Sequence, residues 1–186
     1  MTIQPKDIDL SKLDNYTIPG SIDYNAPRGQ LIPEAKQAII IDYLKQYDIK
    51  IFVETGTACG DTCNAVLPYV DDIYTVELLP EKWEKQCRAI QNPKIKRSFG
   101  HSVQFLNALL PLSKPTLFWL DAHVEGTPDT NDPVQWPIQY ELDAIFKSET
   151  KGLILADDIW EERFWRPYIP ENFKIEWEFG ILRVML

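Results

Sequence analysis

Acidic side chains stand at the ends of short apolar runs in this chain of 186 residues. These acids are Glu54, Glu77, Asp121 and the pair Asp157–Asp158. A carboxylate that directly follows apolar residues of a buried strand is poorly placed for simple solvation, but it can hold a cation or the hydroxyl groups of a ligand. We therefore take these acids as candidate binding residues.

The first acid begins a glycine-containing loop, Glu54-Thr55-Gly56-Thr57-Ala58-Cys59-Gly60. Gly56 lets the backbone turn tightly beside a ligand, and Gly60 begins the next helix without a side chain in the way. The spacing differs from the Gly-x-Gly-x-x-Gly pattern of dinucleotide-binding folds. Glu54 would repel a diphosphate, whereas it would suit a ligand with an ammonium group. Glu77 stands where a carboxylate can accept hydrogen bonds from both hydroxyls of a ribose.

Two residues near the fourth apolar run have types suited to catalysis. His123 is one of two histidines in the chain, and histidine is well suited to general-base work at neutral pH. Asp121 can orient a substrate from the end of the run. The alternatives are structural, with His123 packed in its loop and Asp157 capping the next helix.

The apolar runs alternate with segments of helical periodicity along most of the chain. We expect strands over Ile51–Glu54, Ile73–Glu77, Ile95–Ser98, Thr116–Leu120 and Leu153–Ala156. We expect helices over Pro33–Tyr47, Asp61–Tyr69, Pro80–Gln91, Ser102–Leu110 and Trp136–Lys147. This order predicts an α/β fold with a doubly wound, mostly parallel sheet of about seven strands that helices cover on both faces. Phe173–Phe179, Gly180 and Ile181–Leu186 predict a C-terminal antiparallel hairpin in that sheet.

Length and composition favour one domain. We expect residues 1–30 to form an irregular N-terminal arm and residues 31–186 to form a single domain. The net charge of −9 and the isoelectric point near 4.7 disfavour a nucleic-acid partner. There is no apolar run of about 18 residues that could span a membrane and no apolar core of a signal peptide near Met1. We therefore expect a cytoplasmic protein, as a monomer or a homodimer.

Several of these motifs resemble those of one enzyme superfamily. Ile51–Gly60 followed by Tyr74–Leu78 resembles the first two motifs of the class I S-adenosylmethionine-dependent methyltransferases, which have a Rossmann-like fold. Phe118–His123 and Leu153–Asp158 resemble the fourth and fifth strand ends of that superfamily. The resemblance covers roughly residues 50–186.

This resemblance implies S-adenosylmethionine as the cofactor. Gly56 and its neighbours would line the methionine part of the cofactor, Glu77 would hold the ribose, and His101 and Ser102 would lie beside the adenine. The full set of candidate cofactor-binding residues is Glu54, Thr55, Gly56, Thr57, Gly60, Glu77, Leu78, His101, Ser102 and Asp121.

A narrower resemblance connects the chain with metal-dependent small-molecule O-methyltransferases. Asp121, Asp157 and Asp158 occupy the places of the magnesium ligands of those enzymes. Carboxylate oxygens suit Mg²⁺, which would orient an acceptor hydroxyl and lower its pKa. The chain differs from those enzymes by the polar insertion Glu125–Pro137 and by the absence of a lysine base after Asp121, for which His123 is the nearest substitute.

We therefore expect an S-adenosylmethionine-dependent methyltransferase that methylates a hydroxyl of a small-molecule acceptor, with magnesium as a candidate second cofactor. His123 and Asp121 are the candidate catalytic residues. Residues 1–30 and Glu125–Pro137 are expected to cover the pocket, with Tyr16, Tyr24 or Trp136 near the acceptor. Two alternatives stay open: a non-catalytic protein that binds the cofactor or a partner, and a nicotinamide-dependent oxidoreductase.

Overall fold

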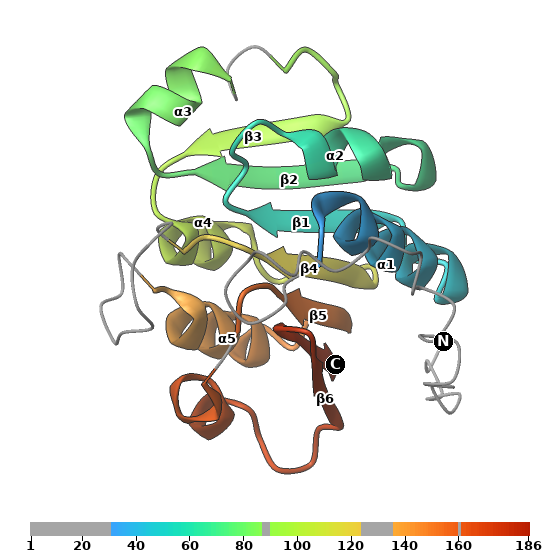
Figure 1. Cartoon of the computed structure of the whole chain (residues 1–186), viewed down its shortest axis with the longest axis vertical. Coiled ribbons are helices and arrows are strands. Elements are labelled where there is room, and N and C mark those ends of the chain that lie inside the picture. The colour runs from blue at the N-terminus through green and yellow to red at the C-terminus, as the bar shows by residue number, and fades with distance from the viewer. Residues whose placement is uncertain (1–30, 87–89, 124–135, 160) are drawn as a thin grey trace.

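The described part of the chain forms one sheet of seven strands with helices on both faces (Figure 1). A computed structural model describes residues 31–86, 90–123, 136–159 and 161–186. The strands are β1 (Ile51–Thr55), β2 (Asp72–Glu77), β3 (Ile95–Phe99), β4 (Thr116–Leu120), β5 (Gly152–Ala156), β6 (Ile175–Glu178) and β7 (Ile181–Met185). The α-helices are α1 (Pro33–Gln46), α2 (Asp61–Val66), α3 (Pro80–Lys85), α4 (Ser102–Leu109) and α5 (Ile138–Lys147). Short 3₁₀ helices are η2 (Leu67–Tyr69), η4 (Glu162–Phe164) and η5 (Arg166–Tyr168).

The strand order is β3-β2-β1-β4-β5-β7-β6. The strands β1 to β5 are parallel, whereas β7 is antiparallel to both β5 and β6. The chain winds outward from β1 through β2 to β3, and then outward on the other side through β4 and β5. The direction of winding therefore reverses between β1 and β4, and ligands of such sheets bind at that point, outside the carboxyl ends of the strands. The predicted fold class is confirmed.

The central strands are buried on both faces because their side chains alternate between two apolar layers. On β4, Leu117 and Trp119 pack in one layer, and Phe118 and Leu120 pack in the other. The first layer lies under α1 and α2, and the second lies under α4 and α5. This double burial explains why the sequence shows continuous apolar runs instead of a polar–apolar alternation.

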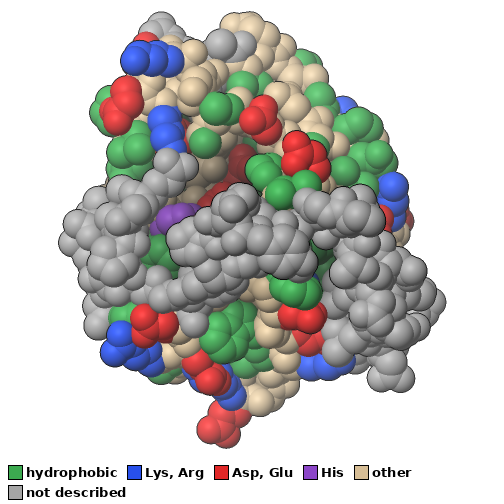
Figure 2. Space-filling model, in the orientation of Figure 1, with side chains coloured by type: hydrophobic (Ala, Val, Ile, Leu, Met, Phe, Trp, Pro, Cys, Tyr) green, Lys and Arg blue, Asp and Glu red, His purple; other side chains and the backbone are tan. Residues whose placement is uncertain are grey.

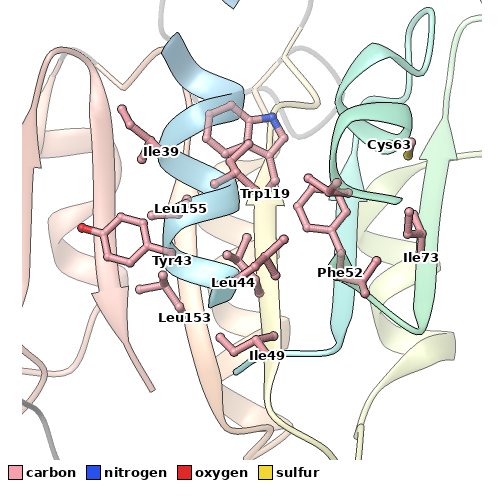
Figure 3. Packing of buried hydrophobic residues seen from close by; sticks show 14 of the residues in the cluster. Ile39, Tyr43, Leu44, Ile49, Phe52, Cys63, Ile73, Trp119, Leu153 and Leu155 are labelled. Atoms are coloured by element: carbon pink, nitrogen blue, oxygen red, sulfur yellow. The ribbon is translucent and has the colours of Figure 1, made fainter. Parts of the chain in front are cut away.

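Helix α1 is fixed to the sheet by one apolar face (Figure 3). Ile40, Tyr43 and Leu44 recur at helical spacing and are at most 7% exposed. They contact the β4 and β5 side chains of the first layer, among them Trp119 and Leu155. Each fully buried aliphatic side chain contributes about 2 kcal/mol by its removal from water. The rest of α1, including its first turns, is thereby held at a fixed place over the sheet.

Two helices end several residues earlier than predicted. The helix expected over Asp61–Tyr69 is α-helical only to Val66 and then tightens into η2, because Pro68 has no N–H for the next α-helical bond. The helix expected to reach Gln91 ends at Lys85, and Gln86 has already left helical geometry, with φ −123° and ψ −65°.

The C-terminal hairpin is present, with a shorter first strand than predicted. It starts at Ile175 and ends at Glu178. Phe179, predicted as the end of the strand, forms the turn together with Gly180, with φ of 51° and 74°. A two-residue turn with two positive φ angles matches the right-handed twist of the flanking strands.

Among the residues that the structure describes, no helix combines the length and the apolar character needed to cross a membrane. The expected N-terminal arm, residues 1–30, lies outside the described part of the chain.

Candidate functional site

The loop after β1 comes very close to the end of β4. Gly56 has φ +85°, and a Cβ atom there would lie 2.3 Å from the backbone oxygen of Asp121. The amide N–H groups of Gly56 and Thr57 both donate to the carbonyl oxygen of Val76 on β2, at 3.0 and 3.1 Å. Glycine is therefore required at position 56 by the contact between two loops as well as by the backbone angle.

Glu77, the last residue of β2, is held by two backbone amides. Its Oε2 accepts a hydrogen bond from the N–H of Ala58, and its Oε1 accepts one from the N–H of Leu79, both at 2.8 Å. The residue is 4% exposed and lines the pocket described below. A carboxylate oxygen can accept more than one hydrogen bond, so each oxygen keeps acceptor capacity for a ligand.

Glu54 lies elsewhere, in the interior between β1 and α2. It is 2% exposed, and its Oε2 accepts hydrogen bonds from the Cys63 thiol and the Thr75 hydroxyl, each at 3.0 Å. Burial raises the pKa of Glu54 to about 7, although these two donors act in the opposite direction. Glu54 is not among the residues that line the pocket, and its contact with a ligand ammonium group stays a prediction.

Other predicted residues of the loop are also inside the fold. Thr57 Oγ1 lies 2.6 Å from Thr75 Oγ1, and Thr55 Oγ1 accepts from the N–H of Asp121 at 3.3 Å. Gly60 begins α2 with φ +78°, where a Cβ would lie 2.5 Å from the side chain of Ile90. Thr55, Thr57 and Gly60 therefore support the loop, whereas Gly56 reaches the pocket itself.

The segment after β3 adds a third side of the pocket. Gly100 has φ +145°, and a Cβ there would meet nothing within 4 Å. His101 caps α4, because its Nδ1 accepts from the N–H of Val103 at 3.2 Å. Gly100, His101 and the buried Ser102 all line the pocket, as does the predicted Leu78.

These segments enclose a pocket of about 220 Å³ at the carboxyl ends of the parallel strands. In the face shown in Figure 2, a histidine and acidic side chains lie in a hollow. The lining residues are Lys36, Gly56, Ala58, Val76, Glu77, Leu78, Leu79, Lys82, Gly100, His101, Ser102, Asp121, Ala122, His123, Pro137, Asp157 and Asp158. The pocket therefore sits at the switch point between β1 and β4.

The three acids Asp121, Asp157 and Asp158, which we call the acid cluster, form one end of this pocket. His123 lies between two of them, with Nδ1 3.3 Å from Asp121 Oδ1 and Nε2 3.2 Å from Asp158 Oδ2. Lys36 Nζ of α1 is 2.6 Å from Asp157 Oδ2 and 3.7 Å from Asp158 Oδ1. Asp158 has φ +55°, a strained angle for a residue with a side chain.

Mutual proximity shifts the pKa values of the charged groups in this region. Burial, together with the charge of Asp157, raises the pKa of Asp121 well above its ordinary value. Burial alone would lower the pKa of His123, but its hydrogen bond to Asp158 and the charge of Asp121 outweigh burial and raise the pKa. Burial also opposes the charge of Lys36, yet Asp157 and Asp158 raise its pKa above 10.5. Lys36 is therefore an ammonium group at neutral pH.

The acid cluster does not fit the magnesium site predicted from the sequence. The protein itself already supplies a positive charge here, because Lys36 Nζ lies 2.6 Å from Asp157 Oδ2, while Asp157 Oδ1 accepts a hydrogen bond from the N–H of Asp158 at 2.9 Å. The two ring nitrogens of His123 contact one carboxylate oxygen of Asp121 and one of Asp158. In the described part of the chain, no group of three or more His, Cys, Asp or Glu side chains is arranged to hold a metal ion.

One residue that lines the pocket, Lys36, and one buried acid behind the pocket wall, Glu141, were not predicted. Lys36 carried no signal in the sequence, because its partner Asp157 lies 121 positions away. Glu141 of α5 is 1% exposed, and burial raises its pKa to about 7 against the hydrogen bonds of Ser102 and Thr55. Its position on the same helical face as Ile138 and Ile145 would have indicated that it is buried.

The segments predicted to cover the pocket are mostly outside the described residues, which exclude 1–30 and 124–135. Tyr16 and Tyr24 belong to these segments. Trp136 is described, is 4% exposed, and has its ring centroid 5.1 Å from that of His123. Trp136 therefore lies at the acid-cluster end of the pocket, where the acceptor was expected.

Comparisons with known proteins agree on the fold. No protein-family model matches the sequence, and no curated protein is similar to it in sequence. The methyltransferase PaMTH1 of Podospora anserina, solved with bound S-adenosylhomocysteine (SAH), is 13% identical over 100% of this chain and 98% of its own, with a TM-score of 0.63. An O-methyltransferase of Bacillus cereus in complex with SAH is 15% identical over 100% of this chain and 94% of its own, with a TM-score of 0.57.

A third structure, precorrin-6y C5,15-methyltransferase of Geobacter metallireducens, is 10% identical over 83% of this chain and 90% of its own, with a TM-score of 0.59. At these levels of identity the likeness defines the fold and not the reaction. The chain has the Rossmann-like fold of the class I S-adenosylmethionine-dependent methyltransferases.

Proposed function

We propose that this protein binds S-adenosylmethionine in the pocket at the switch point and transfers its methyl group to a hydroxyl of a small-molecule acceptor. When bound, this cofactor supplies an electrophilic methyl group on a sulfonium centre. The single observation that carries the proposal is Glu77, a carboxylate that two backbone amides hold at 2.8 Å on the wall of the pocket.

Glu77 fits a ribose better than it fits a phosphate. Its two oxygens are fixed by Ala58 and Leu79 and can each accept a hydrogen bond from a hydroxyl group, so they match a vicinal diol. The same negative charge would repel a pyrophosphate, and the loop after β1 lacks the Gly-x-Gly turn of dinucleotide sites. This contrast favours S-adenosylmethionine over a nicotinamide cofactor.

The remaining walls have complementary roles in the proposal. Gly56 and Ala58 offer backbone and a small side chain for the methionine part, and His101 and Ser102 stand where the adenine would lie. The acid cluster end would take the acceptor, and Asp121 with His123, 3.3 Å apart, would receive its hydroxyl proton. These residues would mainly hold two reactants in the geometry of attack.

The charged residues that line the pocket also limit the charge of the acceptor. The pocket contains four carboxylates, Glu77 and the acid cluster, and two lysines, Lys36 and Lys82. This balance disfavours an acceptor that carries several negative charges near the reacting hydroxyl. We therefore propose a neutral or cationic small molecule, in keeping with the absence of a nucleic-acid partner in the sequence prediction.

Isothermal titration calorimetry with SAH tests the proposal. The protein should bind one SAH per chain, and Glu77→Ala should weaken binding at least tenfold, equivalent to about 1.4 kcal/mol. Glu54→Gln is the matched control, because Glu54 lies near the end of the neighbouring strand β1 but does not line the pocket. A preference for NAD over SAH would refute the proposal, and SAH binding without turnover across an acceptor panel would favour the non-catalytic alternative.

A further inference from the structure

The ammonium group of Lys36 lies beside the acid cluster, where the sequence resemblance places a metal ion. Lys36 belongs to the first turns of α1, which is anchored over the sheet by Ile40, Tyr43 and Leu44. Its side chain is 17% exposed and reaches the carboxyl end of β5, where its ammonium lies 2.6 Å from Asp157. The ammonium is therefore held beside the acid cluster by a helix whose apolar face packs on the sheet.

Like a bound metal ion, the Lys36 ammonium neutralises carboxylates of the acid cluster and faces the pocket. It compensates the charge of two neighbouring carboxylates, at 2.6 Å from Asp157 Oδ2 and 3.7 Å from Asp158 Oδ1. It also lines the pocket, and an ammonium has three N–H donors, of which one is used by Asp157. With respect to the residues that the structure describes, a donor is thus left for an oxygen atom of a molecule in the pocket.

The ammonium also excludes the metal that the sequence resemblance implied. Mg²⁺ binds carboxylate oxygens at about 2.0–2.1 Å. An ion at that distance from Asp157 Oδ2 would compete for the same oxygen with an ammonium already 2.6 Å away. Two positive charges would then face each other in a partly buried site, where their repulsion is weakly screened. The Lys36 ammonium therefore opposes the binding of a divalent cation at Asp157.

We propose that Lys36 is the built-in cation of this site, that it takes the place of the divalent metal, and that it contacts the acceptor oxygen while the acid cluster holds it in position. The role toward the acceptor rests on the proposed function, whereas the exclusion of metal depends only on the residues of this chain. The acceptor is then a molecule that presents an oxygen to an ammonium donor and needs no metal chelation, so adjacent chelating hydroxyls are not required.

Metal binding to the protein without substrate tests this inference directly. Mn²⁺ is a suitable probe, because carboxylate sites that take Mg²⁺ also take Mn²⁺ and the free ion is counted by electron paramagnetic resonance. The wild type should bind no stoichiometric Mn²⁺. Lys36→Met, which keeps the length of the side chain and removes the charge, should bind one Mn²⁺ per chain at least tenfold more tightly than the wild type.

Two further variants separate charge from packing. Lys36→Arg keeps the positive charge and should exclude Mn²⁺ as the wild type does. Lys45→Met removes a lysine from an exposed position of the same helix, where it lies over the ring of Tyr69, and should also leave Mn²⁺ binding unchanged. SAH titrations of the same samples report on the proposed function separately, because Lys36 and the ribose-side Glu77 lie at different ends of the pocket.

The inference is overturned if the wild type and Lys36→Met bind Mn²⁺ equally, whether both bind it tightly or neither binds it. If Lys36→Met does not fold, the wild type decides the question. One Mn²⁺ per wild-type chain that is lost in Asp157→Asn would show a real metal site and would overturn the proposal, whereas its absence would support it.

Discussion

The buried carboxyl group of Glu54 makes the stability of the protein depend on pH in a defined direction. The side chain is 2% exposed, and burial raises its pKa in the folded protein from an ordinary 4.5 to about 7. The hydrogen bonds from Cys63 and Thr75 lower the pKa and offset only part of this effect. The folded protein therefore holds the proton of Glu54 more tightly than the unfolded chain does.

The sign and size of the effect follow from this difference. Because the folded-state pKa is the higher one, the stabilisation is fully present below pH 4.5 and is lost as the pH rises to about 7. The interval of 7 − 4.5, about 2.5 pH units, corresponds to about 3 kcal/mol at 1.36 kcal/mol per unit. Glu54→Gln has no titrating group at this position and should lose this part of the pH dependence.

Urea unfolding at several pH values between about 4.5 and 8 measures the effect. The difference in unfolding free energy between wild type and Glu54→Gln should change by about 3 kcal/mol across this interval, in favour of the variant at high pH. Glu171→Gln, at an exposed glutamate, is the control and should run parallel to the wild type. The unfolding free energy of Glu54→Gln should still depend on pH to some extent, because Glu141 also has a raised pKa of about 7. Parallel curves for wild type and Glu54→Gln would refute the reasoning.

Two further predictions concern the loop and the helix that shape the site. Gly56→Ala should lower the unfolding free energy by about 3 kcal/mol or more and weaken SAH binding, since its Cβ would lie 2.3 Å from the oxygen of Asp121. Gly100→Ala, with open space around the Cβ, should lower the unfolding free energy by less in chemical denaturation. Equal losses of unfolding free energy in the two variants would contradict a steric clash between position 56 and Asp121. Leu44→Ala should lower the unfolding free energy by about 3 kcal/mol, because this side chain is 1% exposed under α1. A loss below about 1 kcal/mol would show that α1 is not packed on the sheet as described.

The fold was predictable because burial on both faces of a parallel sheet leaves a strong pattern. The apolar runs of the five parallel strands were recognisable, and parallel strands bring their carboxyl ends to one edge of the sheet. Glu77, Asp121, Asp157 and Asp158 therefore meet around one pocket, as the sequence indicated. The hairpin was recognisable from Gly180, whereas the strand end at Glu178 was not, because Phe179 is apolar yet occupies the turn.

Glu54 shows why a site is harder to predict than a fold. The sequence prediction ended the first strand at Glu54, whereas β1 continues to Thr55 and pairs Glu54 with Thr75. One additional residue in the ladder keeps the carboxylate inside the sheet, on the same face as Phe52, where it meets Cys63. Glu77 is the last residue of its own strand and reaches the pocket. An uncertainty of one residue in a strand end therefore decides whether an acid is placed in the interior or on the pocket wall.

Lys36 shows a second limit of sequence reasoning. The three acids were recognised, but a carboxylate cluster can be neutralised by a metal ion or by a side chain from anywhere in the fold. Lys36 precedes the first strand, and only the packing of α1 brings it to Asp157. The choice between magnesium and an internal cation is therefore made by tertiary structure.

A crystal structure of the protein with SAH tests the central claim most directly. The ligand should lie in the pocket at the switch point between β1 and β4, with both ribose hydroxyls within hydrogen-bond distance of the Glu77 carboxylate. Density for SAH at another place on the surface, or an empty pocket at concentrations where calorimetry shows saturation, would contradict the assignment of this pocket.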